Sequence, residues 1–319
     1  MKPFMKRSLT SVIRTGRAYG AWPVLAESDG ELALLSFSDG ASRVSRWDPR
    51  GGREAWQVDL RAGGGECAVA HSAGGGAVLA VASEDGVERL DVLTGTSLPS
   101  PHMEQVTTIW DVAAGLLPDG RSFFAGAGHV HQLVHRWDAA TGEPLSAPLA
   151  GHMGCVMAVA VVPASDTGRA VIASGDEAGV ILLWDAATGV RVGDPITGPG
   201  DAVRQIVPLR LSTGSDLIVC VDRDSLLWRW DAATGELLGA PVRLGSESEY
   251  PTLTAAVVDG ASRLFVSGTG DDKVWEWDPV TGNAVDAVLP GISFAVLVRS
   301  DGAVVFAAGT REGDIALYA

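Results

Sequence analysis

The chain has 319 residues, of which 46% are hydrophobic and 20% charged, and its formal net charge is −15. An acidic surface of this kind disfavours nucleic-acid binding, because affinity for phosphate backbones depends on lysine and arginine side chains. No run approaches the roughly 18 consecutive apolar residues of a membrane span, so we expect no membrane association. The basic N-terminal residues, 1–7, are followed by no apolar segment, and a secretory signal is therefore not expected.

The three cysteines, Cys67, Cys155 and Cys220, lie in apolar segments that look like strands. An odd number of cysteines in such positions is typical of buried free thiols in a reducing compartment. The cysteines therefore favour a cytoplasmic protein.

From the N-terminus onward, short apolar runs alternate with Gly, Asp and Ser turns, which predicts an all-β protein. Seven times a short strand ends in an aromatic residue or leucine, and six of the seven are followed by Asp. These strand-ending residues lie 41 to 47 residues apart and are Trp47, Leu90, Trp137, Trp184, Trp230, Trp277 and Tyr318. A period in the forties over a whole chain indicates a repeat architecture. Trp110-Asp111, only 27 residues before Trp137, marks no repeat of its own.

The fourth repeat shows the expected elements most clearly. Strands are predicted over residues 156–162, 170–174, 181–185 and 190–196, and polar turns separate them. Four short antiparallel strands with a more polar outer strand are typical of a propeller blade. The turn Asp-x-x-Thr-Gly recurs in five repeats, where Asp can accept hydrogen bonds from backbone amides and Gly can adopt a positive φ.

The segments RWDAATGEPL, LWDAATGVRV and RWDAATGELL resemble the WD-repeat (WD40) β-propeller family in its bacterial form. The resemblance covers essentially the whole chain and implies a seven-bladed propeller of four-stranded antiparallel blades. Two features of the family are weak here. The Gly-His that opens a repeat is clear only at Gly151-His152, and the Asp before the third strand has a good candidate only in Asp271. We therefore expect the family's Asp-His-Ser-Trp hydrogen-bond network to be largely missing.

The last repeat ends after its third strand, at Ala319, which would leave an open sheet edge. Residues 11–15 are predicted to supply the missing fourth strand, as the usual closure of the family implies. The expected organisation is a flexible tail over residues 1–8 and a single propeller over residues 9–319.

The resemblance implies a non-catalytic scaffold that binds a protein or peptide through its loop face. Aromatic and arginine side chains are the expected anchors of such an interface. The candidate anchors are Tyr19, Trp22, Arg204, Tyr250, Phe294 and Arg311. We expect a monomer without a cofactor, a bound metal or a catalytic residue.

An alternative function is small-molecule binding or catalysis at the channel mouth near the third repeat. Five of the six histidines fall in or beside this repeat, and Trp110 lies on its inner strand. If imidazoles converge, they can bind a transition metal or transfer protons near neutral pH. The candidate residues are His102, Trp110, His129, His131 and His152. The competing interpretation is separate, water-facing histidines, with His152 filling the structural Gly-His position.

An arginine directly precedes four of the strand-ending residues. These residues are Arg46, Arg89, Arg136 and Arg229. We expect them to form ion pairs between neighbouring blades rather than to bind a ligand.

Overall fold

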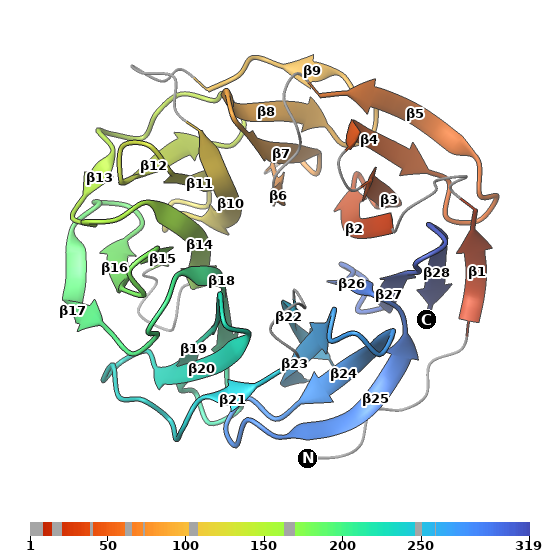
Figure 1. The fold of residues 1–319 in the computed structure, drawn as a ribbon. Coiled ribbons are helices and arrows are strands. Elements are labelled where there is room, and N and C mark those ends of the chain that lie inside the picture. The colour runs from red at the N-terminus through yellow and green to blue at the C-terminus, as the bar shows by residue number, and fades with distance from the viewer. Residues whose placement is uncertain are drawn as a thin grey trace. The chain divides into compact units, whose positions relative to one another are not determined.

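The computed structural model describes residues 9–14, 21–38, 41–60, 66–72, 74–101, 108–162, 170–245, 251–258 and 260–319. These residues form 28 strands, β1 to β28, and no helix. The strands form seven four-stranded antiparallel sheets (Figure 1). The predicted fold class is confirmed: the protein is an all-β, seven-bladed β-propeller. By its internal contacts the chain divides into two compact units, residues 60–208 and residues 1–59 with 209–319.

The unit formed by residues 60–208, called unit 2 below, contains blades two, three and four. Blade two consists of β6 (Cys67–His71), β7 (Ala77–Ser83), β8 (Gly86–Asp91) and β9 (Ser97–Leu98). Blade three consists of β10 (Ile109–Leu116), β11 (Ser122–Gly128), β12 (Leu133–Asp138) and β13 (Leu149–Ala150). Blade four consists of β14 (Val156–Val162), β15 (Val171–Asp176), β16 (Ile181–Asp185) and β17 (Arg191–Ile196).

The other unit, called unit 1 below, contains blades one, six and seven and most of blade five. Blade one consists of β2 (Ala21–Ser28), β3 (Glu31–Ser38), β4 (Ala41–Trp47) and β5 (Glu54–Asp59). Blade five consists of β18 (Val203–Arg210), which begins in unit 2, with β19 (Asp216–Asp222), β20 (Leu226–Asp231) and β21 (Val242–Arg243). Blade six consists of β22 (Thr252–Val258), β23 (Ala261–Ser267), β24 (Lys273–Trp277) and β25 (Ala284–Pro290).

Blade seven combines the two ends of the chain, as predicted. Its sheet has the order β1-β28-β27-β26, where β26 is Ser293–Val298, β27 is Val304–Gly309 and β28 is Ile315–Tyr318. The closing strand β1 is Leu9–Ile13, two residues earlier than the sequence predicted. It pairs antiparallel with β28, and Ile13 is buried against Leu34, Trp47 and Leu317. Residues 1–8 lie outside the described residues, so the expected flexible tail stays a prediction.

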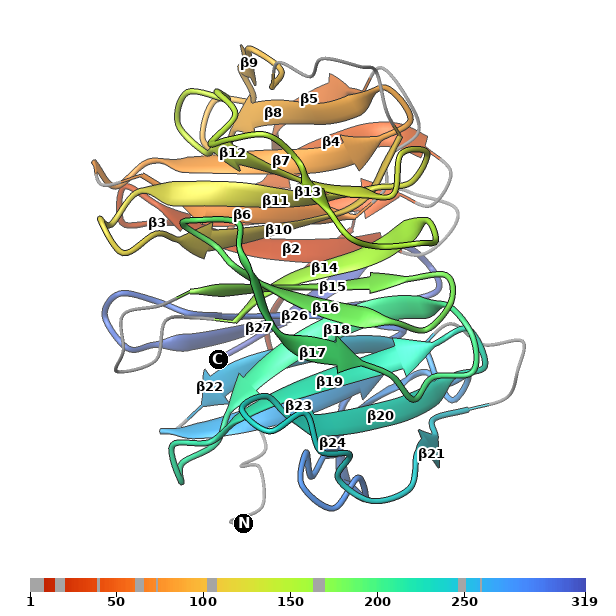
Figure 2. The same ribbon diagram turned by 90° about the vertical axis from the view of Figure 1, so that its left-hand side faces the viewer.

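In unit 2 the first strands of the three blades, β6, β10 and β14, lie side by side, and β10 packs against both of the others (Figure 1). Figure 2 shows the sheets of blades two, three and four stacked one above another. Their facing side chains form the core, including Phe123, Ile172 and Trp184 between blades three and four. Burying such apolar area is the main favourable term in folding.

The Asp-x-x-Thr-Gly turn has the predicted geometry in blade three. Asp138 Oδ1 accepts hydrogen bonds from the backbone N–H groups of Ala140 and Thr141, at 3.0 and 2.9 Å. Gly142 has φ +79°, and a Cβ there would lie 2.2 Å from the guanidinium of Arg89. The glycine is therefore required both by the backbone and by the arginine packed beside it.

The expected ion pairs of the recurrent arginines are mostly replaced by hydrogen bonds to backbone carbonyls. Arg89 donates to the carbonyls of Ala139 and Ala140 in the next blade, at 2.8 and 2.7 Å. Arg136 donates to Ala186 O, and Arg229 to Val280 O, at the equivalent turns. The predicted contacts between blades form at Arg89, Arg136 and Arg229, but as hydrogen bonds to carbonyls rather than ion pairs. Each of these carbonyls belongs to the first or second residue after the Asp of the turn. In the described part of the chain, no neighbouring strand offers a hydrogen-bond donor to the backbone there. Arg46 forms an ion pair with Glu31 of its own blade, at 3.3 Å.

Candidate functional site

In blades three and four, the residues just before the first strand and the turn between the second and third strands lie at the same end, because His129 N–H donates to Thr108 O and Glu177 N–H donates to Cys155 O. We call this end the loop face. In unit 2, Trp110 lies near this end on β10, where Ile109 pairs with Gly128 but Val112 pairs with Gly126. Two residues thus oppose one across the sheet, and a bulge of this kind redirects a side chain. The side chain of Trp110 is 43% exposed.

His129 is the described histidine that contacts Trp110. Their ring centroids are 5.0 Å apart, with an angle of 44° between the ring planes. The N–H of His129 donates to Thr108 O at 2.9 Å, which fixes the start of the β11–β12 turn. The Nδ1 atom of His129 is buried without a hydrogen-bond partner. Buried polar atoms usually have a hydrogen-bond partner, so the Nδ1 atom of His129 is an exception.

The other candidate histidines of blade three do not join this contact. His131 is exposed on the β11–β12 turn, and His102 lies outside the described residues. His135 stacks on Trp137, with the ring planes 4° apart. Burial, and secondarily the charge of His131, lower the pKa of His135 to about 4, so its ring is neutral at pH 7. Among the described residues, no three His, Cys, Asp or Glu side chains are grouped as metal ligands.

His152 is buried in blade four and forms part of a hydrogen-bond network. Its Nδ1 lies 2.9 Å from Asp176 Oδ2, and its Nε2 lies 2.7 Å from Ser174 Oγ. Trp184 Nε1 donates to the same Ser174 Oγ at 2.8 Å. Burial alone would raise the pKa of Asp176, but the hydrogen bonds from His152 and the backbone outweigh it, and the pKa is lowered.

One expectation about this network was therefore wrong. A complete Asp-His-Ser-Trp network exists in blade four, and its carboxylate is Asp176 rather than Asp271. The sequence placed Asp176 in an ordinary polar turn, whereas β15 extends to Asp176 and pairs it with Val156. Asp271 instead accepts hydrogen bonds from Trp275 Nε1 and Thr269 Oγ1. His152 is thus a structural residue in the described blade, as the competing interpretation held.

The candidate anchors of the partner-binding face lie in different environments. In unit 1, Trp22 is 38% exposed on β2, and Arg311 is exposed and paired with Asp272 at 2.6 Å. Phe294 is buried, and its ring centroid lies 5.0 Å from that of Phe265. Arg204, on the part of β18 that belongs to unit 2, is half-buried. Tyr19 and Tyr250 lie outside the described residues.

Sequence reasoning missed Asp111, which links two blades at the first-strand edge of unit 2. Its Oδ2 accepts the N–H of Val159 on β14 at 2.9 Å. Asp111 keeps some contact with water, but burial and the charge of Glu66 raise its pKa well above the usual range. No local pattern reveals this role, because Asp111 follows Trp110 in the bulge and its partner is 48 residues away.

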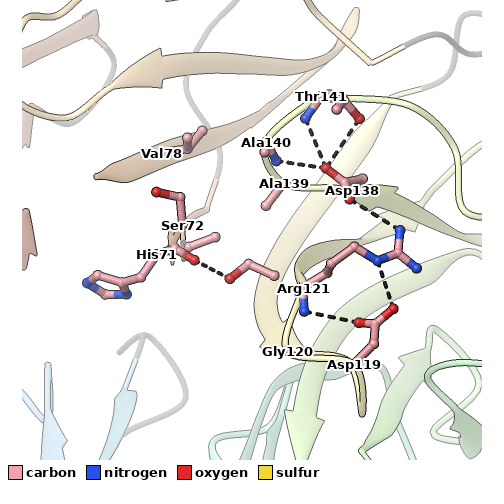
Figure 3. Close-up of a pocket in the computed structure, with 12 residues that line it drawn as sticks. His71, Ser72, Val78, Asp119, Gly120, Arg121, Asp138, Ala139, Ala140 and Thr141 are labelled. Carbon is pink, nitrogen blue, oxygen red and sulfur yellow. Dashed lines mark hydrogen bonds and ion pairs between the residues drawn. The ribbon is translucent and has the colours of Figure 1, made fainter. Parts of the chain in front are cut away.

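A pocket of about 320 Å³ lies at the end of blades two and three opposite the loop face (Figure 3). It is lined by Ala70, Val78 and Ala139, by the β10–β11 turn and by the turn after β12. In the β10–β11 turn, Arg121 Nε donates to Asp119 Oδ2 at 2.8 Å. Its Nη1 lies 3.5 Å from Asp138 Oδ2. Sequence reasoning did not find this pocket either.

No known family model matches the chain, and no curated protein is significantly similar to it. Among the residues that the structure describes, there is no apolar helix of the length that a membrane crossing requires.

Proposed function

We propose that the protein is a non-catalytic WD-repeat scaffold that binds a partner protein or peptide through its loop face. The observation that carries this proposal is a set of exposed apolar side chains at the loop-face end of unit 2. Trp110 is 43% exposed, Val130 58% and Met153 89%. They come from β10, the β11–β12 turn and the loop before β14. Exposed apolar side chains that share one end of the blades are suited to an interaction surface, and Trp is enriched among binding anchors.

The WD-repeat assignment is supported by two features of the blades. The Asp-His-Ser-Trp network of blade four is the one that the family resemblance leads us to look for. The recurrent Asp-x-x-Thr-Gly turns supply the second feature, since the Asp caps its own turn in blades two to six. The three free thiols support a cytoplasmic location. Trp22 and Arg311, both exposed, stay candidate anchors in unit 1.

The alternative function, a small-molecule site near blade three, is favoured by one specific observation. The buried Nδ1 of His129 has no partner, and the ring lies against the exposed ring of Trp110. An aromatic surface beside an unsatisfied nitrogen is suited to a flat ligand with a hydrogen-bonding group. We place this alternative second, because the described candidate histidines other than His129 do not contact Trp110.

Comparative affinity capture tests the proposal. The wild-type chain, a Trp110→Ala/Met153→Ser variant and a Leu116→Ser control are used as baits in extracts of the native cell. Leu116 is a matched control because it is 59% exposed at the opposite end of the strand that carries Trp110. A partner retained by the control and lost by the double variant supports the loop face. An identical set of captured proteins for all three baits contradicts it.

A further inference from the structure

The pocket of Figure 3 has a fixed apolar floor. Ala70 and Ala139 are buried, and Val78 is half-buried beside them. Two contacts between blades hold the walls in place: the Ser122 hydroxyl donates to His71 O, and Arg89 donates to Ala139 O. The cavity exists because small side chains occupy the floor. It is therefore preformed, which lowers the entropic cost of binding an occupant.

The rim of the pocket is anionic. It carries Asp119, Asp138 and Arg121, a formal charge of −1, on a chain of net charge −15. Figure 3 shows the guanidinium of Arg121 between the two carboxylates, while the ring of His71 points away from them. An anionic ligand would be repelled here, whereas a cation is attracted.

Asp138 has an oxygen available to such a cation. Its Oδ1 accepts hydrogen bonds from Ala140 N, Thr141 N and Thr141 Oγ1 within its own turn. Its Oδ2 lies 3.5 Å from Arg121 Nη1, well beyond the roughly 2.7–2.9 Å of a close charge-assisted hydrogen bond. The side chain of Asp138 is only 14% exposed, so a further donor would meet a largely desolvated carboxylate.

We propose that this pocket receives an arginine side chain from a basic segment of a partner protein. The aliphatic stem lies on Ala70, Val78 and Ala139, and the guanidinium donates to Asp138 Oδ2. Arginine buries its stem on apolar surface while its head remains polar, and its planar fork matches a carboxylate. Arg121 competes for the same carboxylate from within the chain, so binding displaces it toward Asp119. This site lies at the opposite end of the blades from the loop face and is independent of the proposed function.

The test is an amide NMR titration of the full-length protein with an acetylated, amidated Gly/Ser peptide that contains one arginine. A second peptide carries glutamine in place of the arginine. We expect saturable shifts at the amides of Ala140 and Thr141 with the arginine peptide only, weakened by added salt. Equal binding of the glutamine peptide, shifts confined to the loop face, or no saturable shift overturns the proposal.

Three variants complete the test. Asp138→Asn keeps an oxygen for its turn but loses the charge, and we expect about fivefold weaker binding of the arginine peptide. Asp231→Asn is the matched control, because Asp231 caps the same turn in blade five with the same three hydrogen bonds, at 2.9, 2.9 and 3.2 Å. Arg121→Ala is expected to bind more tightly, since it removes the competing cation. Unchanged affinity in both Asp138→Asn and Arg121→Ala overturns the proposal, and thermal melting of both Asn variants shows whether their folds are equally intact.

Discussion

Arg89 of blade two donates from its guanidinium to the carbonyl of Ala139 in blade three, 50 residues further along the chain, at 2.8 Å. A second bond from the same nitrogen reaches Ala140 O. The repeat thus links successive blades through an arginine and the backbone of a turn. The same link recurs from Arg136 to Ala186 O and from Arg229 to Val280 O.

Replacing Arg89 with Met removes this link and leaves buried carbonyl groups without donors. We expect the free energy of unfolding to fall by about 3 kcal/mol, which urea denaturation can measure. Arg43→Met is the control, because Arg43 forms an exposed ion pair with Asp59 and its loss should not be measurable. Equal stability of the Arg89 variant and the wild type would show that the link contributes nothing.

The network in blade four gives a pH-dependent prediction. The pKa of Asp176 is lowered in the folded protein, so its contribution is fully present above the unfolded value, about 3.9, and is lost as pH falls through the folded value. Asp176→Asn should therefore destabilise the protein by about 1–3 kcal/mol at pH 7, and the difference should shrink below pH 4. Denaturation at several pH values checks this, with the exposed Asp194→Asn as control. A difference that is constant with pH would refute the charged role of Asp176.

Asp111 should behave in the opposite sense. Its pKa is raised in the folded protein, so the ionised form carries a cost that appears as pH rises from the unfolded value toward the folded one. Asp111→Asn keeps an oxygen that can accept the N–H of Val159 but removes the charge. We expect the variant to be more stable than the wild type at pH 7 and equal to it near pH 3. A variant that is less stable at pH 7 would mean that the charge stabilises the fold.

The closure of blade seven predicts a strong effect of N-terminal deletion. Removing residues 1–16 takes away β1, exposes the edge of β28 and leaves the cluster around Leu317 without Ile13. We expect a sharply lower melting temperature and aggregation, because open sheet edges pair with other chains. Removing residues 1–8 keeps β1 and serves as the control. If the longer deletion melts like the full chain, β1 does not close the blade.

Much of the fold was predictable because the repeat places the same side chains at the same points of each blade. The strands of residues 156–162 and 181–185 have the predicted ends, since turn residues bound both. The strand that ends at Asp176 was predicted to end two residues earlier, because Asp is typical of turns when its hydrogen-bond partner is unknown. A hydrogen bond to a buried histidine 24 positions away overrides that local preference.

The sites were far less predictable, since they combine residues from different repeats. The pocket of Figure 3 depends on Ser122 reaching His71, 51 residues earlier, and neither residue carries a recognisable pattern. Phe294 was named as a surface anchor, yet it packs with Phe265 and Phe306, because an apolar residue on a first strand can face either side. Trp110 shows the opposite case, where a bulge directs a large ring toward water.

The most direct test of the central claim is the affinity of a captured, purified partner for the wild-type chain and for the two variants. We predict that Trp110→Ala/Met153→Ser raises the dissociation constant at least about tenfold, as the loss of an aromatic anchor should. Leu116→Ser should bind within about twofold of the wild type. If the double variant binds as tightly as the wild type, the loop face of unit 2 is not the binding surface.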